Sequence, residues 1–152
     1  MIRHPHLQLS NEVARAINIG LPIVALESTV ITHGLPKPQN IELARDMEKT
    51  IREFGATPAT IALLDGKIRI GLTDEELIRL ADSDSLLKVS HRDFATAIVK
   101  KINGGTTVAG TMLAANMVGI KVFATGGIGG VHQESSFDVS TDLHSLAEIP
   151  TI

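Results

Sequence analysis

Short apolar runs and helical stripes of apolar residues alternate along the chain. The continuous run Leu21–Leu26 predicts a strand that is covered on both faces. Between Pro38 and Gly55, apolar residues recur at intervals of three or four, which predicts a helix of about four turns. A shorter stripe over Asn11–Asn18, preceded by Ser10 as a capping residue, predicts an earlier helix.

The middle of the chain carries the clearest local signals. The runs Thr60–Leu64 and Lys67–Gly71 flank Asp65-Gly66, a dipeptide typical of a type I′ hairpin turn. The residues Thr73-Asp74-Glu75-Glu76 follow, and their spacing predicts a capping box at the start of another helix. This stretch therefore predicts a β-hairpin that leads into a helix.

The same alternation continues to the end of the chain. The predicted elements are a strand over 86–89, a helix from Ser90 to about 102, a helix from Thr106 or Thr107 to 117, a strand over 121–125, a glycine loop over 126–130 and a last short helix from Thr141 or Asp142. Strands that alternate with helices, with one hairpin, predict a single α/β domain over residues 1–152 with a mixed, mostly covered sheet.

Composition narrows the function classes. Charged residues make up 20% of the chain, the net charge is −3, and Trp and Tyr are absent. The sequence therefore offers neither the basic surface nor the stacking aromatics that nucleic-acid binding needs. The absence of cysteine excludes disulfides, thiolate metal sites and a cysteine nucleophile. No segment has ~18 uninterrupted apolar residues, and the N-terminus lacks a secretory pattern. A soluble cytoplasmic protein is the expectation.

Glu27 stands where the first buried strand is predicted to end. Ligands bind at the carboxyl ends of strands in α/β sheets, so an isolated carboxylate there is a candidate acid or base. Partial burial would raise its pKa and suit it to proton transfer. A helix cap or a salt bridge explains the same residue equally well, and the sequence leaves both interpretations open.

Two glycine-rich segments and two aspartates are further candidates. Gly104–Thr107 could cradle a phosphate at a helix N-terminus, although an ordinary helix–helix turn is the favoured interpretation. The four glycines of Gly126–Gly130 allow a backbone to approach a ligand closely, whereas His132 alone is a weak signal. Asp138 and Asp142 could hold a hard cation through oxygen and water, or could merely cap the last helix.

Five segments together carry a resemblance to one family. They read ALESTVITHGLP, KVSHRD, NGGTTVAGTM, VFATGGIGGVH and FDVSTDL. In order and spacing this pattern resembles pseudouridine-5′-phosphate glycosidase, also called the indigoidine synthase A family. The resemblance implies reversible cleavage of the C–C glycosidic bond of pseudouridine 5′-phosphate to uracil and ribose 5-phosphate. It also implies a three-layer α/β/α fold, a homotrimer and a divalent cation, Mn²⁺.

The resemblance also implies roles for individual residues. The family's proton donor falls on Glu27, and its metal-holding aspartate falls on Asp138. Its substrate-binding lysine falls on Lys88, and its main-chain substrate contact falls on Val108. The remaining expected phosphate or sugar contacts are Thr106, Thr107, His132, Ser140, Thr141 and Asp142.

The sequence departs from the family pattern at one catalytic position. Uracil leaves through carbon and is a poor leaving group, and the family opens the ribose and forms an imine between C1′ and a lysine. By spacing, that lysine would fall shortly after Ile152, in a C-A-G-x-K-S-like segment, and no lysine follows Lys121. Three interpretations remain: an N-terminal half of the enzyme, alone or assembling with a second piece; an inactive homologue that binds a phosphorylated sugar or nucleotide or assembles with partner chains; and a degenerate, poorly folded piece.

Overall fold

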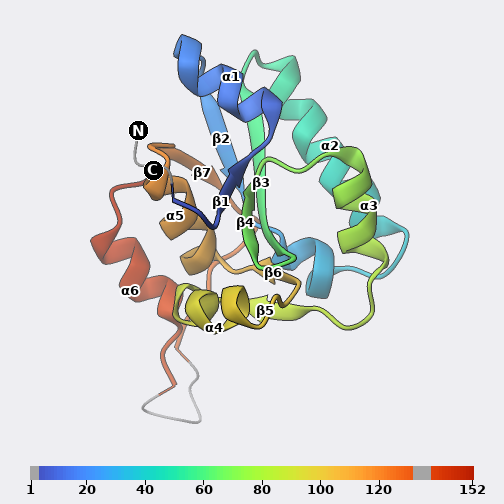
Figure 1. Cartoon of the computed structure of the whole chain (residues 1–152), viewed down its shortest axis with the longest axis vertical. Coiled ribbons are helices and arrows are strands. Elements are labelled where there is room, and N and C mark those ends of the chain that lie inside the picture. Colours follow the sequence, from blue (N-terminus) through green and yellow to red (C-terminus); the bar gives the residue numbers. More distant parts are fainter. Residues whose placement is uncertain (1–3, 132–137) are drawn as a thin grey trace.

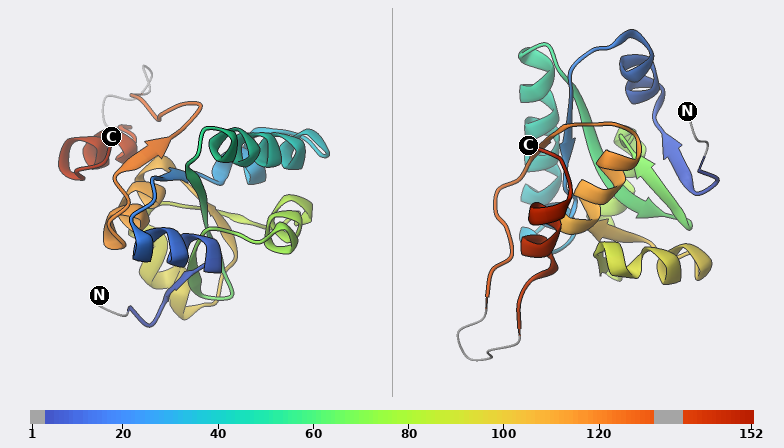
Figure 2. Two further views of the ribbon diagram at one scale, coloured as in Figure 1. Left: turned by 90° about the horizontal axis from the view of Figure 1, so that it is seen from above. Right: turned by 90° about the vertical axis from the view of Figure 1, so that its left-hand side faces the viewer.

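The structure, a computed structural model, describes residues 4–131 and 138–152. In this part of the chain, strands form one mixed sheet with helices on both of its faces (Figures 1 and 2). The strands are β1 Leu7–Leu9, β2 Ile23–Leu26, β3 Thr57–Leu64, β4 Lys67–Ile70, β5 Leu87–Val89, β6 Gly104–Thr106 and β7 Val122–Ala124. The helices are α1 Asn11–Ile19, α2 Gln39–Glu53, α3 Asp74–Asp82, α4 Phe94–Val99, α5 Val108–Met117 and α6 Thr141–Glu148, with a π-helix at Val30–Gly34 and a 3₁₀-helix at His91–Asp93.

Strand β3 is the centre of the sheet. The main strand order is β1-β4-β3-β2-β7, with β6 also paired to β3 and β5 paired to β6. The pairs β1–β4, β2–β3, β2–β7 and β5–β6 are parallel, whereas β3–β4 and β3–β6 are antiparallel. The prediction of an α/β fold with a mixed sheet is confirmed, and most of the pairings are parallel.

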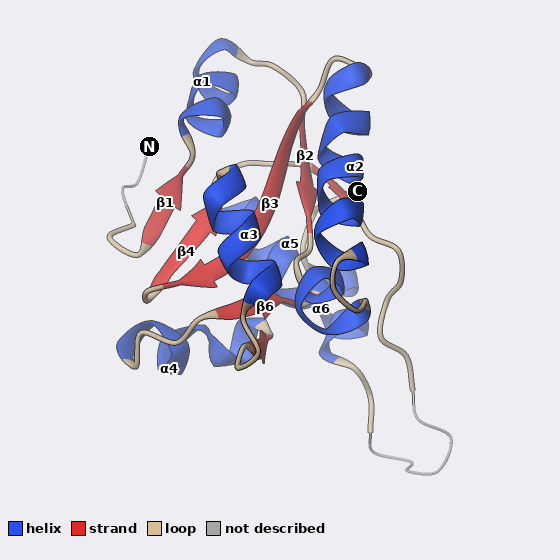
Figure 3. Cartoon of the chain, turned by 90° about the vertical axis from the view of Figure 1, so that its right-hand side faces the viewer, coloured by secondary structure: helices blue, strands red, loops and turns tan. Residues whose placement is uncertain are grey.

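Strands β2 and β6 lie along the same edge of β3 and meet end to end. β2 pairs with β3 as far as Thr60, and β6 pairs with Ala62 and Leu63 just beyond it. Strand β4 occupies the opposite edge of β3. Because β2 runs parallel to β3 and β6 antiparallel, their carboxyl ends face each other, and Figure 3 shows β6 beyond the end of β2. This junction positions the site described below.

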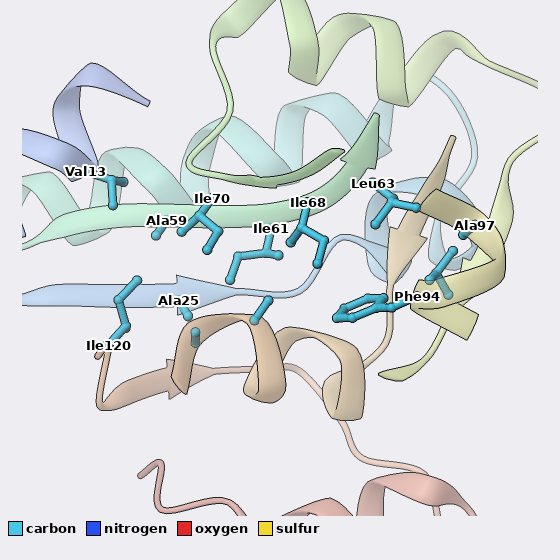
Figure 4. Packing of buried hydrophobic residues seen from close by; sticks show 13 residues of the cluster. Val13, Ala25, Ala59, Ile61, Leu63, Ile68, Ile70, Phe94, Ala97 and Ile120 are labelled. Atoms are coloured by element: carbon cyan, nitrogen blue, oxygen red, sulfur yellow. The ribbon is translucent and has the colours of Figure 1, made fainter. Parts of the chain in front are cut away.

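Side chains of β3 alternate between two hydrophobic clusters, as the pleat of a strand requires. Ile61 and Leu63 join a cluster with residues of α1, α4 and α5 on one face (Figure 4). Ala62 and Leu64 join a second cluster with residues of α2 and α3 on the other face. All eight residues of β3 are buried. The layers are therefore helices, sheet and helices, in the order that the resemblance implied.

The local signals in the sequence are reproduced in the structure. The Val13 N–H donates to Ser10 Oγ at 3.2 Å, so Ser10 caps α1. Asp65 and Gly66 have φ of 52° and 71°, as a type I′ turn requires, and β3 and β4 pair across them. Thr73 begins α3 with a capping box. The predicted helix that ends at Gly55 is α2.

Some predictions were wrong in detail. Gly104 and Gly105 belong to an inner strand, β6, and are not a helix–helix turn. A Cβ at Gly104 would lie 2.6 Å from Val89 Cγ2, and one at Gly105 would lie 2.9 Å from the Ser28 carbonyl oxygen. Glycine is therefore required here by close packing. The helix predicted after Ser90 is divided into a 3₁₀-helix and α4.

The sequence pattern did not predict β1 or the π-helix at Val30–Gly34. Strand β1 has only three residues, and its pairing partner β4 lies far away in the sequence. In the described part of the chain, no helix is both long and apolar enough to cross a membrane.

Candidate active site

A cavity of about 450 Å³ opens where the carboxyl ends of β2 and β7 face those of β5 and β6. Its lining combines four parts of the chain: the end of β2, the segment after β5, the start of α5, and the glycine loop with the start of α6. The cavity brings together most of the predicted site residues, namely Glu27, Lys88, Thr107, Val108, Asp138, Ser140, Thr141 and Asp142.

Glu27 is the half-buried acid of the cavity. It follows the last residue of β2, and Thr125, just after the neighbouring strand β7, donates a hydrogen bond from Oγ1 to Glu27 Oε1 at 2.5 Å. Burial raises the pKa of the Glu27 carboxyl above its ordinary value, and the negative charge of Asp142 raises it further. The Thr125 hydrogen bond and the positive charge of Lys88 oppose this shift in pKa. The acid is thus biased towards its protonated form.

The opposite wall of the cavity is cationic. Lys88 on β5 and Arg92 in the following 3₁₀-helix both line it, and neither side chain makes an ion pair or hydrogen bond with the described residues. Thr107 caps α5 by accepting the Gly110 N–H at 3.2 Å. Val108 is the first residue of α5, so its N–H has no partner within the helix. Lys88, Arg92 and the Val108 N–H form a wall that favours an anion, although the Asp142 carboxylate already accepts the Ala109 N–H of the same helix N-terminus.

Asp142 joins two walls of the cavity to each other. Its Oδ1 accepts the Ala109 N–H of α5 at 2.9 Å, and its Oδ2 accepts the Gly129 N–H of the glycine loop at 2.9 Å. The residue is only 7% exposed. Ser140 caps α6 by accepting the Asp142 N–H at 3.2 Å. Although Asp142 lines the cavity, both of its carboxylate oxygens are engaged with backbone amides.

Thr106 does not line the cavity. It is fully buried, and its hydroxyl donates to the Ile61 carbonyl oxygen at 2.6 Å and lies 2.8 Å from Thr111 Oγ1. The Thr106 N–H donates to Ser28 Oγ at 2.9 Å, which joins β6 to the segment after β2. The contacts of Thr106 therefore stabilise the strand junction. His132 lies outside the described residues.

The sequence did not identify three lining residues, Thr29, Arg92 and Val139, whereas Gly127, Ile128 and Gly129 belong to the glycine loop that it proposed as a close approach to a ligand. Arg92 had a usable signal, because it belongs to the segment KVSHRD, four residues after Lys88. No local pattern in the sequence indicates Thr29, because its side chain is positioned by a hydrogen bond that it donates to the Thr106 carbonyl oxygen, 77 residues away.

The residues that could hold a metal ion are few. Asp138 is exposed and lines the cavity, whereas the oxygens of Asp142 already accept two amide hydrogens. Among the described residues, no group of three or more His, Asp or Glu side chains could hold an ion. A single carboxylate such as Asp138 could hold a hard cation only where water or substrate oxygens supply the remaining ligands.

The comparisons with known proteins agree with the motifs. A family model described as indigoidine synthase A like protein matches residues 12–152. The chain belongs to this family. Over 146 residues the chain is 53% identical to the pseudouridine-5′-phosphate glycosidase of Petrotoga mobilis, covering 95% of this chain and 48% of that protein. It is 57% identical over 145 residues to pseudouridine-5′-phosphate glycosidase 1 of Rhizobium johnstonii, covering 94% and 46%.

Two solved structures share the fold. The prealnumycin C-glycosynthase AlnA, solved in complex with ribulose 5-phosphate, matches with a TM-score of 0.84 and 42% identity, covering 94% of this chain and 47% of that one. An indigoidine synthase A-like protein of Thermotoga maritima matches with a TM-score of 0.84 and 36% identity, covering 97% and 48%. The chain thus spans about half the length of the curated relatives and solved structures that it matches.

Proposed function

We propose that the cavity binds a phosphorylated pentose and that this chain carries the acid and the phosphate-binding wall of a pseudouridine-5′-phosphate glycosidase. The observation that carries the proposal is the opposition of one acid, whose pKa is raised, to two cations and a helix N-terminus across one cavity. The relatives are named pseudouridine-5′-phosphate glycosidases, which supports cleavage of a glycosidic bond, and uracil and ribose 5-phosphate are the products that the resemblance implies. The ribulose 5-phosphate bound by AlnA supports a phosphosugar ligand.

Lys88, Arg92 and the Val108 N–H are the groups that we propose hold the phosphate. Phosphate oxygens accept strong hydrogen bonds from lysine and arginine, and a helix N-terminus adds an unpaired amide and a favourable dipole. Both cationic side chains lack an ion-pair partner among the described residues, which favours their use in binding an anionic ligand. Thr107, Ser140 and Thr141 line the same cavity and can reach the sugar hydroxyls.

Glu27 is the group that we propose transfers the proton. Burial raises the pKa of the Glu27 carboxyl, and a shift in this direction favours the protonated form that a general acid needs. Asp142 is engaged with backbone amides and is unsuited to act as a second exchanging carboxyl. With Asp142 engaged and Asp138 proposed as the ligand of the cation, Glu27 is the one carboxyl that we assign to proton transfer, which fits a route in which another group forms the covalent bond.

Mn²⁺ is proposed as the cation, with Asp138 as its protein ligand. The exposed carboxylate at the cavity wall suits a hard ion that otherwise binds water and substrate oxygens. A bound Mn²⁺ would supply positive charge to those oxygens. The homotrimer that the resemblance implies also belongs to this proposal, and sedimentation of the chain tests it.

A second candidate function is binding of a phosphosugar without cleavage. It is favoured by one observation on the lysines of the cavity lining. Lys88 is the only lysine that lines the cavity in the described part of the chain, and we assign it to the phosphate. The two candidates share the binding step and differ in the chemistry that follows.

Calorimetric titration with ribose 5-phosphate tests the shared binding step. A lost charge-assisted contact costs ~1.5–3 kcal/mol, so Lys88→Ala should weaken binding roughly ten-fold or more. Glu27→Gln should change the affinity much less, because its assigned role is proton transfer. Asp138→Ala should remove any dependence of binding on Mn²⁺. Lys100→Ala, at an exposed position after α4, is the matched control and should bind as the unmodified chain does.

Two results would contradict the assignment. One is loss of binding in Glu27→Gln with intact binding in Lys88→Ala, which would exchange the two roles. The other is a folded chain, by circular dichroism, that does not bind ribose 5-phosphate at all. Release of uracil from pseudouridine 5′-phosphate then distinguishes the two candidate functions, since only the first includes it.

A further inference from the structure

The hydroxyl of Thr125 lies between two acceptors. Thr125 Oγ1 is 2.5 Å from Glu27 Oε1 and 2.8 Å from the carbonyl oxygen of Gly127. The Gly127 N–H donates back to the same Oγ1 at 3.2 Å. A threonine hydroxyl has one hydrogen to donate and two lone pairs with which to accept. It can therefore donate to Glu27 or to the Gly127 carbonyl, but not fully to both.

The protonation state of Glu27 decides between these two arrangements. An ionised carboxylate only accepts, so the Thr125 hydroxyl must donate to it, and the Gly127 carbonyl oxygen loses that hydrogen bond. A protonated Glu27 can instead donate its own hydrogen to Thr125 Oγ1, and the hydroxyl hydrogen is then free to turn to Gly127. Only the Glu27 proton is gained or lost, and no bond between heavy atoms changes.

We infer that Thr125 is a positioning residue, which aligns the Glu27 carboxyl and couples its protonation state to the backbone of the glycine loop at Gly127. This loop lines the cavity, so a change in its hydrogen bonding changes how one wall of the cavity is held in place. When Glu27 is protonated, both the N–H and the carbonyl oxygen of Gly127 would form hydrogen bonds with Thr125 Oγ1. When Glu27 is ionised, only the Gly127 N–H would do so. The inference deepens the proposed function, because it rests on the assignment of Glu27 as the acid.

Other charged groups face Glu27, and they act differently. Asp142 on α6 and Lys88 on β5 interact with it through their charges, and Arg92 and Asp138 line the same cavity. Burial raises the pKa of Glu27, the charge of Asp142 raises it further, and the charge of Lys88 lowers it. Among the described residues, Thr125 alone forms a side-chain hydrogen bond with the Glu27 carboxylate, so the coupling to the loop passes through its hydroxyl.

Nuclear magnetic resonance titration of the chain, without substrate, tests the coupling. The Glu27 carboxyl carbon and the Gly127 carbonyl carbon should titrate with the same midpoint in the unmodified chain. In Thr125→Val the Glu27 midpoint should rise, because the hydrogen bond that lowers its pKa is lost. The Gly127 response should fall to that of the Gly129 carbonyl carbon, which lines the same cavity without a bond to Thr125. Thr125→Ser should restore both responses.

Two controls isolate the hydroxyl. Thr96→Val removes a hydroxyl from the exposed face of α4 and should leave both midpoints unchanged. Glu27→Gln should make the Gly127 carbonyl carbon independent of pH, and this result does not depend on the folding of Thr125→Val. The inference is overturned if Gly127 does not follow Glu27 in the unmodified chain, or if Thr125→Val keeps the full Gly127 response. Either outcome is separate from ribose 5-phosphate binding, so failure of the proposed function is recognised independently.

Discussion

Replacing Asp142 by alanine should destabilise the chain strongly, because the substitution removes the acceptor of two backbone amides at once. The N–H groups of Ala109 and Gly129 each donate to one carboxylate oxygen at 2.9 Å. Ala109 is fully buried, so water cannot take the place of the missing oxygen, whereas Gly129 is only partly buried. The substitution therefore leaves one amide unsatisfied and the other partly hydrated.

The expected magnitude follows from these two amides. A buried donor without a partner costs ~1–3 kcal/mol, and the partly buried one costs less, so the free energy of unfolding should fall by about 3 kcal/mol. Loss of a negative charge beside the N-terminus of α5 adds ~0.3–1 kcal/mol. Asp142→Asn keeps one carbonyl oxygen as an acceptor, and its loss of stability should be about half as large.

Urea denaturation of the two variants measures this free energy directly. The slope m should stay constant, since the surface exposed on unfolding does not change. Asp46→Ala, on the exposed face of α2, is the control and should stay within ~0.5 kcal/mol of the unmodified chain. If Asp142→Ala matched this control, the two amide bonds would contribute no net stability, and a role for Asp142 in substrate contact alone would be the better explanation.

Three further predictions concern the acid, the covalent chemistry and the strand junction. Burial raises the pKa of Glu27 in the folded chain, so the chain loses stability as the pH rises through that pKa and the carboxyl ionises. Thermal unfolding at pH 8 should therefore show Glu27→Gln to be more stable than the unmodified chain. The difference should vanish below pH ~4, the ordinary range of the glutamate pKa. Borohydride treatment with ribose 5-phosphate should leave no adduct on Lys88 by mass spectrometry, and an adduct there would contradict its assignment to the phosphate. Gly104→Ala should lower stability in urea by ~1–3 kcal/mol through overpacking against Val89, whereas Gly126→Ala, with open space around its Cβ, should not.

The elements that could be predicted from the sequence depend on near neighbours in the chain. Ser10 caps α1 through an amide three residues away, and Thr73 caps α3 in the same manner. The hairpin depends on the positive φ of Asp65 and Gly66, which these residue types readily adopt. Such interactions form within one turn, so local spacing is enough to identify them.

The elements that could not be predicted depend on partners distant in the sequence. Glycine is depleted in strands, so β6 gives no strand signal, and its place is set by pairing with β3 and β5. The hydrogen-bond partners of Asp142 and Thr106 are determined by the folded chain: Asp142 accepts the Ala109 N–H, 33 residues away, and Thr106 donates to the Ile61 carbonyl oxygen, 45 residues away. The resemblance could identify such residues as part of a site. It could not distinguish the side chains that are available to a ligand from those that form hydrogen bonds within the protein around the cavity.

The junction of β2 and β6 explains how Glu27 lies at the same cavity as Lys88 and Arg92. Carboxyl ends of parallel strands gather at one edge, so β2 brings Glu27 beside β7 and its glycine loop, and β5 brings Lys88 beside β6 and the start of α5. An ordinary parallel sheet would place all of these groups along one edge. Because β6 is antiparallel to β3 whereas β2 is parallel to it, the carboxyl ends of β2 and β7 face those of β5 and β6 instead. A ligand between them would be reached by Glu27 from one side and by Lys88 and Arg92 from the other, as the proposed binding of a phosphosugar requires.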